Sequence, residues 1–240
     1  MRFEINQKCV SCMACVRVCP TDAIAVEETG LWILDDACVR TGLCYEACPH
    51  DAIDVIGDRE RVRDLLDAGG ALLVLAGEAA VHFHPHAMEQ VVNACFRLGF
   101  AGVHHGVIGE ELVAEAYLRL WADESWRTLI RSTCPVLVEC VRSDYPELVK
   151  YLAPVVTPLQ AEVRALRRGY GADVPIVFAG VCLADAVDTV DAALTLNELG
   201  DLFAGAAIAL EEQPVYFHRI PGERRRYVST PGGMPLPLLH

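Results

Sequence analysis

The chain has 240 residues, which suits one large domain or a small domain followed by a medium one. Its formal net charge is -13, from 20 Lys and Arg against 33 Asp and Glu. That balance argues against a nucleic-acid partner, because binding phosphates requires basic side chains. Hydrophobic residues make up 53% of the chain and the mean hydropathy is +0.29, which a sizeable core or subunit interfaces would explain.

The N-terminal stretch MRFEINQKC leads directly into a cysteine motif, without the apolar segment of a signal peptide. No apolar run reaches the length that spans a bilayer. We therefore expect a cytoplasmic protein without membrane insertion. In that reducing compartment, the 11 cysteines indicate metal ligands rather than disulfides.

The first cysteine motif is CVSCMACVRVCP, residues 9–20, with the spacing C-x2-C-x2-C-x3-C-P. This spacing is typical of bacterial ferredoxins. Three closely spaced cysteines wrap one iron–sulfur cubane, whereas the fourth lies too far round the loop and ligates a second cluster. The following segment, TDAIAVEETG, alternates apolar and polar residues and predicts a short strand.

A second copy of the motif, CVRTGLCYEACP, spans residues 38–49. It is followed by HDAIDVIGD, which predicts another short strand. Thr41 stands where the first copy has its second cysteine. Residues 1–58 have 4 Lys and Arg against 10 Asp and Glu, a net charge of about -6, and such an acidic surface suits docking onto basic patches of redox partners.

Over nearly all of residues 1–58 the chain resembles the dicluster domain of bacterial-type ferredoxins. The resemblance implies two one-electron carriers side by side. Their implied ligands are, for cluster I, Cys9, Cys12, Cys15 and the remote Cys48, and for cluster II, Cys38, Cys44 and the remote Cys19, with Thr41 at the fourth position.

The chemistry at Thr41 leaves three alternatives open. A threonine hydroxyl is a hard, weakly acidic ligand and a poor replacement for a thiolate on iron. One alternative is loss of the unliganded iron, which leaves a 3Fe–4S cluster. Another is a complete cube with water, hydroxide, Asp35 or Asp36 on the odd iron, and the third is absence of cluster II. We expect one 4Fe–4S cluster and a second cluster that is 3Fe–4S or an incompletely ligated 4Fe–4S.

Predicted helices and strands alternate after the second motif. Strands are predicted over 71–76, 101–105 and 174–181, and helices over 58–70, 86–100 and 109–121. This alternation predicts an α/β domain with three layers and a mostly parallel sheet. We therefore expect a small α+β dicluster ferredoxin domain over 1–58 and the α/β domain over 59–240.

Four segments of the second part resemble iron-only (FeFe) hydrogenases, in the order that the family has them. They are RSTCPVLVECVRSDYPELVKYLAPVVTPLQA, similar to the T-S-C-C-P segment, VFAGVCLAD, similar to the M-P-C-x-x-K-K motif, VDAALTLNELGDLF, and STPGGMP. The resemblance covers most of residues 70–235. It implies a hydrogenase-like α/β body behind a ferredoxin domain.

The departures from that family concern its catalytic positions. In active members four cysteines hold the cubane of the active-site cluster, and the matching cysteines here are Cys134 and Cys182. The thiol that relays protons matches Thr133, and the lysine of the second motif falls at Asp185. No cysteine follows Cys182, so the bridging thiolate of the di-iron site has no counterpart. We predict no hydrogenase activity.

Two readings remain for Cys134 and Cys182: vestigial positions, or a third cluster completed by a partner or by a non-cysteine ligand. We expect Cys95 and Cys140 to be buried structural cysteines. The apolar tail PGGMPLPLLH, residues 231–240, is expected to lie along the protein's own core or to insert into a partner.

The leading interpretation is an iron–sulfur electron-transfer subunit in a hetero-complex with a redox protein or with oxidoreductase subunits. Its hydrogenase-like body would not be catalytic. One alternative is a redox- or oxygen-sensing regulatory component that uses the incomplete cluster at Thr41. Another is a metalloenzyme with a new centre at Cys134 and Cys182.

Overall fold

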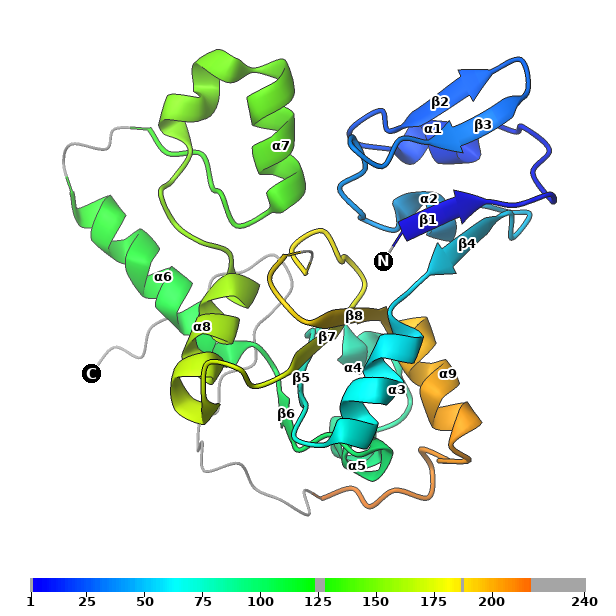
Figure 1. Cartoon of the computed structure of the whole chain (residues 1–240). Helices are drawn as coiled ribbons and strands as arrows, with labels where there is room; N and C mark the ends of the chain where they lie inside the picture. Colours follow the sequence, from blue (N-terminus) through cyan, green and yellow to red (C-terminus); the bar gives the residue numbers. More distant parts are fainter. Residues whose placement is uncertain (1, 124–127, 187, 217–240) are drawn as a thin grey trace.

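The computed structural model describes residues 2–123, 128–186 and 188–216 (Figure 1). Within these residues, two small antiparallel sheets of two strands each precede a four-stranded parallel sheet that is flanked by helices. No described helix is both long enough and apolar enough to cross a membrane.

The N-terminal unit consists of two strand pairs with the cysteine loops between them. The first strand pairs with the last, and the two middle strands form a hairpin. Its small core contains Phe3, Ile24, Leu31 and Ile53, against which the motif cysteines other than the exposed Cys12 pack. The elements are β1 (Arg2–Ile5), α1 (Ala14–Val18), β2 (Ile24–Glu27), β3 (Gly30–Ile33), α2 (Leu43–Glu46) and β4 (Ile53–Ile56).

The parallel sheet has the strand order β6-β5-β7-β8, and all three neighbouring pairs are parallel. Successive side chains of β5 enter different cores: Leu72 and Val74 pack on one face of the sheet, and Leu73 and Leu75 on the other. Both faces are therefore buried, as an uncharged, β-branched strand pattern predicts. The strands are β5 (Leu72–Leu75), β6 (Gly102–His104), β7 (Ile176–Gly180) and β8 (Ala192–Thr195).

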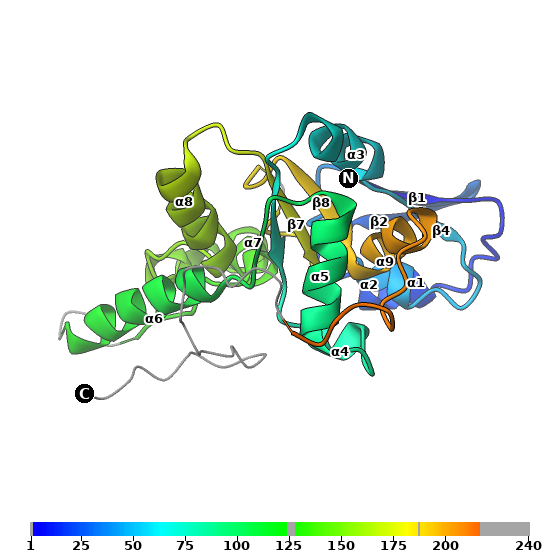
Figure 2. The same ribbon diagram turned by 90° about the horizontal axis from the view of Figure 1, so that it is seen from below.

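Helices cover both faces of this sheet. Helices α3 (Arg59–Ala68), α5 (Met88–Leu98) and α9 (Leu196–Gly205) pack on one face, and α8 (Pro158–Tyr170) packs on the other (Figures 1 and 2). The expected three-layer α/β architecture is confirmed.

Helix α6 (Val107–Ala122) lies against the outer side of α8. The contact depends on Gly109, because a Cβ there would collide with the carbonyl oxygen of Pro158, and the Gly109 amide donates to Oε2 of the buried Glu162 at 2.6 Å. The remaining elements are α4 (Ala79–His82), α7 (Pro135–Asp144) and the 3-10 helix η1 (Pro146–Tyr151).

The two cysteines expected to be structural differ in burial. Cys95 is fully buried in α5, as predicted. Cys140 is not: it is half-buried, and its thiol lies 3.7 Å from a carboxylate oxygen of Asp144. The reason is that α7 does not pack on the sheet and buries only Val141. The apolar spacing of α7 therefore does not place Cys140 in a core.

Polar contacts tie the end of the N-terminal unit and the start of α3 to the edge of the body. Asp58 accepts a hydrogen bond from the amide of Ala193 in β8 at 2.9 Å. Arg59 forms an ion pair with Asp201 at 3.0 Å and approaches the buried Glu198 at 3.6 Å. These contacts cross from the start of α3 to β8 and α9.

Candidate iron–sulfur centres

The four cysteines predicted to hold cluster I line one cavity, whose apolar wall includes Leu31 and Ile53. Cys15 is buried and Cys12 is exposed, so the cavity lies close to the surface. Burial raises the pKa of the Cys15 thiol, and the neighbouring Cys9 and Cys48 raise it further. A positively charged iron centre in this cavity would stabilise its cysteines as thiolates.

The three cysteines predicted for cluster II lie together in the same small core. Burial raises the pKa of Cys44 to about 11, and the nearby Cys38 and Cys19 contribute in the same direction. The remote Cys19 of the first motif thus lies beside the second motif, as the ferredoxin resemblance implies.

Two backbone amides donate to cysteine sulfurs at equivalent places in the repeat. The amide of Ala23 donates to Cys19 Sγ at 3.2 Å, and the amide of Ala52 donates to Cys48 Sγ at 3.3 Å. Hydrogen bonds to sulfur stabilise thiolate and tune cluster potential. The residues present therefore fit iron–sulfur clusters, with cluster I at four thiols and cluster II at three.

The backbone of the two loops repeats as closely as their sequence. A left-handed conformation occurs at three residues of the first motif region and again 29 residues later in the second. The pairs are Ser11 and Arg40, Met13 and Gly42, and Asp22 and Asp51. Non-glycine residues in this conformation cost about 1–3 kcal/mol, so both loops keep a shape that only the surrounding structure makes tolerable.

The hydroxyl of Thr41 is engaged within its own loop, where it accepts a hydrogen bond from the amide of Leu43 at 3.4 Å. Thr41 is partly exposed. The second loop thus keeps the cluster-wrapping backbone while one ligand position lacks a thiol. The difference between the two sites is chemical and not a difference in chain path.

The second loop lies against the carboxyl edge of the parallel sheet. A Cβ added to Gly42 would be 3.7 Å from the carbonyl oxygen of Val181, the first residue after β7. Figure 1 shows the N-terminal unit on the side of the sheet where β7 ends and its yellow loop begins. Because β6 and β7 lie on opposite sides of β5, the strand order changes direction at β5. The carboxyl edge of a parallel sheet at such a switch point is the usual position of a ligand.

Cys134 and Cys182 approach each other at this edge. Cys134 precedes α7 as its N-cap, Cys182 follows β7, and both are exposed. Desolvation by neighbouring atoms raises the pKa of Cys182, and Cys134, Asp185 and Glu78 add to the increase. Among the described residues, no three His, Cys, Asp or Glu side chains are arranged to hold a single metal ion.

Asp185, at the position of the family's lysine, lies in the loop between β7 and β8 and contacts Thr157, the N-cap of α8. The hydroxyl of Thr157 donates to it, whereas burial raises the pKa of the carboxyl. Thr157 also caps α8 by accepting from the amide of Gln160 at 3.2 Å.

The sequence analysis missed the supporting residues of the site. The amide donors Ala23 and Ala52 and the close approach at Gly42 were not identified. The repeat contained a signal for the first two, because each lies four residues after a remote cysteine. Nothing in the sequence indicated that Gly42 would approach Val181.

Two family models match the chain. Residues 72–234 match the model described as the iron only hydrogenase large subunit, C-terminal domain. Residues 8–52 match a 4Fe-4S dicluster domain. No curated protein matches the chain.

Solved FeFe-hydrogenase structures share this fold. One, from work on oxygen inactivation and the 2Fe subcluster of the H cluster, matches with a TM-score of 0.55 and 19% identity, over 66% of this chain and 50% of that one. HydA(deltaEFG), from work on H-cluster assembly, matches with a TM-score of 0.57 and 20% identity, over 66% of this chain and 49% of that one. Apo HydA1 from Chlamydomonas reinhardtii, in a variant form, matches with a TM-score of 0.56 and 19% identity, over 66% of this chain and 50% of that one.

The chain spans about half the length of these structures. A 4Fe–4S ferredoxin-like domain joined to a hydrogenase-like domain supports an iron–sulfur redox role. The model match over 72–234 covers more than half of the chain. The chain therefore belongs to the iron-only hydrogenase large subunit family, through its C-terminal domain, and has a 4Fe-4S dicluster domain in front of it.

Proposed function

We propose that this chain is an electron-transfer subunit that passes single electrons through two ferredoxin clusters to or from a partner oxidoreductase. The observation that carries the proposal is the placement of the two cysteine loops. Cys12 of the cluster I site is exposed, whereas the cluster II loop approaches Val181 of the body. When bound, each cluster supplies a one-electron couple.

The chain's own residues would set the conditions for that transfer. The amides of Ala23 and Ala52 stabilise thiolate at Cys19 and Cys48. The apolar side chains Leu31 and Ile53 limit water at the cluster I cavity. The hydrogen bond from the amide of Ala193 in β8 to Asp58 would help to hold the end of the ferredoxin unit at a fixed place on the body.

In this proposal the hydrogenase-like body does not catalyse hydrogen chemistry. Thr133 and Asp185 stand at the positions that the resemblance assigns to the proton-relay thiol and the lysine. Neither a hydroxyl nor a carboxylate reproduces those functions. The body would instead position the ferredoxin unit and bind partners.

We assign a 3Fe–4S cluster to the site at Thr41. Three thiolates without a fourth soft ligand hold the fourth iron weakly. The hydrogen bond from Leu43 engages the Thr41 hydroxyl within the loop, which supports the loss of that iron.

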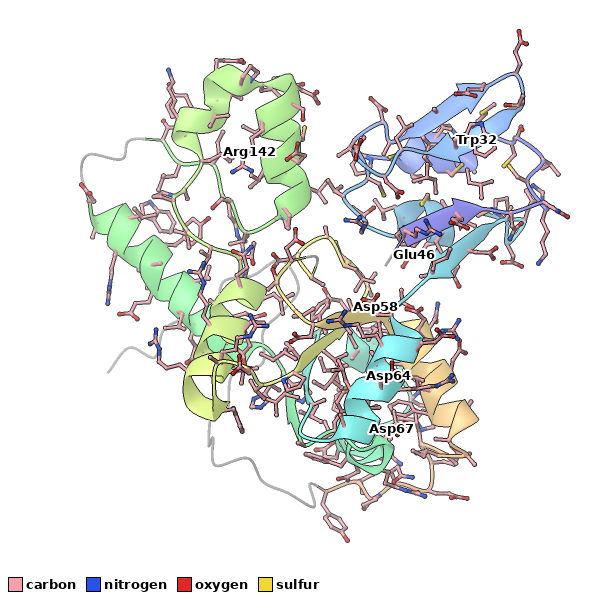
Figure 3. All side chains as sticks on the ribbon, viewed as in Figure 1. Trp32, Glu46, Asp58, Asp64, Asp67 and Arg142 are labelled. Atoms are coloured by element: carbon pink, nitrogen blue, oxygen red, sulfur yellow. The ribbon has the colours of Figure 1, made fainter. Side chains whose placement is uncertain are left out.

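The proposed partner is an oxidoreductase subunit or redox protein with a basic docking face, in the cytoplasm. The acidic charge of the chain supports this choice. Exposed apolar side chains near the clusters support it as well: Val10 is 62% exposed and Trp32, labelled in Figure 3, is 53% exposed. The apolar tail that also suggested a partner lies outside the described residues.

Two assays on one anaerobic preparation test the proposal. Reduced protein is mixed with oxidised cytochrome c, and reoxidation of the clusters is followed optically. The same protein is incubated with reduced methyl viologen, and hydrogen is measured by gas chromatography. We expect cluster reoxidation and no hydrogen above the protein-free blank. Hydrogen evolution by the protein would refute the non-catalytic body.

A sensing role is the second candidate, and the missing thiol at Thr41 is the observation that favours it. An incompletely ligated cluster reacts readily with oxygen or changes its iron content with redox state. If this role holds, brief exposure to air changes the cluster II signal reversibly and changes the affinity for a partner subunit. A partner affinity that is the same before and after exposure would refute it.

A new metal centre at Cys134 and Cys182 is the third candidate, favoured by the electrostatic proximity of the two thiols. It requires metal beyond the two ferredoxin clusters. Metal analysis of the double variant Cys134→Ser, Cys182→Ser tests it: lower metal content than in the unmodified chain would support the centre, and equal content would exclude it.

A further inference from the structure

A cavity of about 590 Å³ lies between the cluster II loop and the body. One wall is the segment Cys38–Arg40, directly before Thr41. The opposite walls come from α7, from the chain after η1 and from the loop after β7. Pockets of this size typically hold small organic ligands, and positions between domains are common for them.

Two arginines line this cavity without a partner among the described residues. Arg40 belongs to the cluster II loop, and its Nε is buried and makes no hydrogen bond. Arg142 comes from α7, and Figure 3 labels it between α7 and η1. Neither side chain forms an ion pair in the described part of the chain, although carboxylates line the same cavity.

Two of the three cavity carboxylates do have partners. Glu139 accepts a hydrogen bond from the hydroxyl of Ser143 at 3.4 Å, and Asp185 accepts one from Thr157. Asp188 is the third. The cavity therefore contains two unpaired guanidinium groups together with a local excess of one negative charge.

That combination selects the class of ligand. A guanidinium group binds a planar carboxylate with two parallel hydrogen bonds. A multiply charged phosphate or dicarboxylate would be repelled strongly by the three acidic side chains. A monocarboxylate with an apolar chain has a single negative charge and would be repelled less. Pro135, Val138 and Val155 provide apolar contacts in the same cavity.

We infer that this cavity is a binding site for a small organic carboxylate, held by Arg40 from the ferredoxin unit and Arg142 from the body. The ligand would join the two units beside cluster II. An amino acid and a plain carboxylic acid both contain the recognised group. An amino acid would additionally place its ammonium group near Asp188. This inference does not depend on the electron-transfer proposal, because binding is measured on resting protein.

Isothermal titration calorimetry on the cluster-loaded protein tests the site with two probes, pentanoate and norvaline, which share one carboxylate and an apolar chain and differ in the ammonium group. We expect at least one probe to bind with a dissociation constant below about 10 mM. Arg40→Gln and Arg142→Gln should each weaken binding by about tenfold or more, because each removes a charge-assisted hydrogen bond. Tighter binding of norvaline than of pentanoate would assign the site to amino acids, and the reverse order to plain carboxylic acids.

Arg97→Gln is the matched control, because Arg97 is exposed on α5 and does not line the cavity. It should leave binding unchanged. If Arg40→Gln fails to load its clusters, Arg142→Gln tests the site alone, since Arg142 belongs to the body. Absence of binding by both probes at about 10 mM, or equal binding by Arg142→Gln and the unmodified chain, would overturn the inference.

Discussion

At the scale of single residues, Thr41 makes the second half of the ferredoxin repeat chemically different from the first. Its loop keeps the left-handed residues and the sulfur environment of the complete loop. A hydroxyl that already accepts from Leu43 stands where a thiolate is required. Restoring a single sulfur should therefore complete the site without rebuilding the loop.

Thr41→Cys should convert cluster II to a fully ligated 4Fe–4S cluster. We expect about one additional iron per chain and loss of the 3Fe–4S signal in the oxidised protein, because the fourth iron gains a thiolate. Iron analysis and electron paramagnetic resonance (EPR) measure both. Thr29→Cys, which adds a thiol on the exposed turn between β2 and β3, is the control and should change neither. A 3Fe–4S signal that persists in Thr41→Cys would show that the missing ligand does not determine cluster type.

Glu198 is a second residue with a local effect, because it is a carboxyl buried at the junction. It caps α9 together with Thr195, whose amide donates to it at 2.8 Å. Burial raises its pKa, and the hydrogen bonds of Thr195 and the charge of Arg59 only partly oppose this. The folded protein therefore holds this proton more tightly than the unfolded chain does.

We therefore expect Glu198 to make the free energy of unfolding depend on pH. As pH rises through the window between the unfolded and the folded pKa of Glu198, the folded state holds more protons, so the free energy of unfolding falls. Glu198→Gln removes the ionisable group, and with it this pH dependence, while keeping a hydrogen-bond acceptor. The stability of Glu198→Gln relative to the unmodified chain should rise as pH increases above the unfolded pKa of about 4.3 and level off above the folded pKa. Denaturation followed by circular dichroism measures it, and a pH-independent difference would contradict the assignment.

At the scale of elements, the turn between β4 and α3 fixes the ferredoxin unit to the body. Gly57 lies so close to Glu198 that an added Cβ would collide with its carboxylate. The carboxylate cannot move aside without losing the two hydrogen bonds that it accepts from the amide and the hydroxyl of Thr195. A glycine is needed here for space.

Gly57→Ala should lower the free energy of unfolding by about 1–3 kcal/mol. Gly169→Ala is the matched control, because Gly169 lies in α8 with no atom near its added Cβ, and it should be neutral or slightly stabilising. Chemical denaturation of the two variants gives the comparison. Equal stability of both would mean that the junction adjusts without cost.

The elements also show what the sequence could predict and what it could not. The expected strands at 71–76, 101–105 and 174–181 correspond to β5, β6 and β7, because uncharged apolar runs between helices are a strong local signal. Cys140 was placed wrongly, because apolar spacing in α7 is a local property, whereas burial depends on which element packs against it. In the described part of the chain, α7 does not pack on either face of the sheet.

The location of the candidate site depended on contacts between distant segments. The ferredoxin repeat was readable because its ligands and its backbone shape recur at a fixed interval. Strand order and domain placement bring Gly42 close to Val181. They also bring Arg40 and Arg142 to the same cavity. Neither of these is encoded in a short motif.

At the scale of the whole molecule, acidic charge dominates. The net charge is -13, and the exposed Glu46 lies on α2 of the ferredoxin unit (Figure 3). A surface of one sign steers oppositely charged partners toward it over distances comparable with the screening length.

Electron transfer to a basic partner should therefore depend on salt. The second-order rate constant for reduction of cytochrome c should fall by about tenfold or more between low and high ionic strength. Stopped-flow absorbance measures it. A small uncharged acceptor serves as the control and should show little change. A rate that rises or stays constant with salt for cytochrome c would contradict electrostatic docking.

EPR spectroscopy of the anaerobically purified protein, with iron and sulfide counted on the same sample, tests the central claim most directly. The claim is that this chain holds two unequal clusters at the ferredoxin cysteines and no metal in the body. It predicts about seven irons per chain, a 3Fe–4S signal before reduction and a 4Fe–4S signal after dithionite. About four irons without a second cluster, or clearly more than about eight, would contradict it.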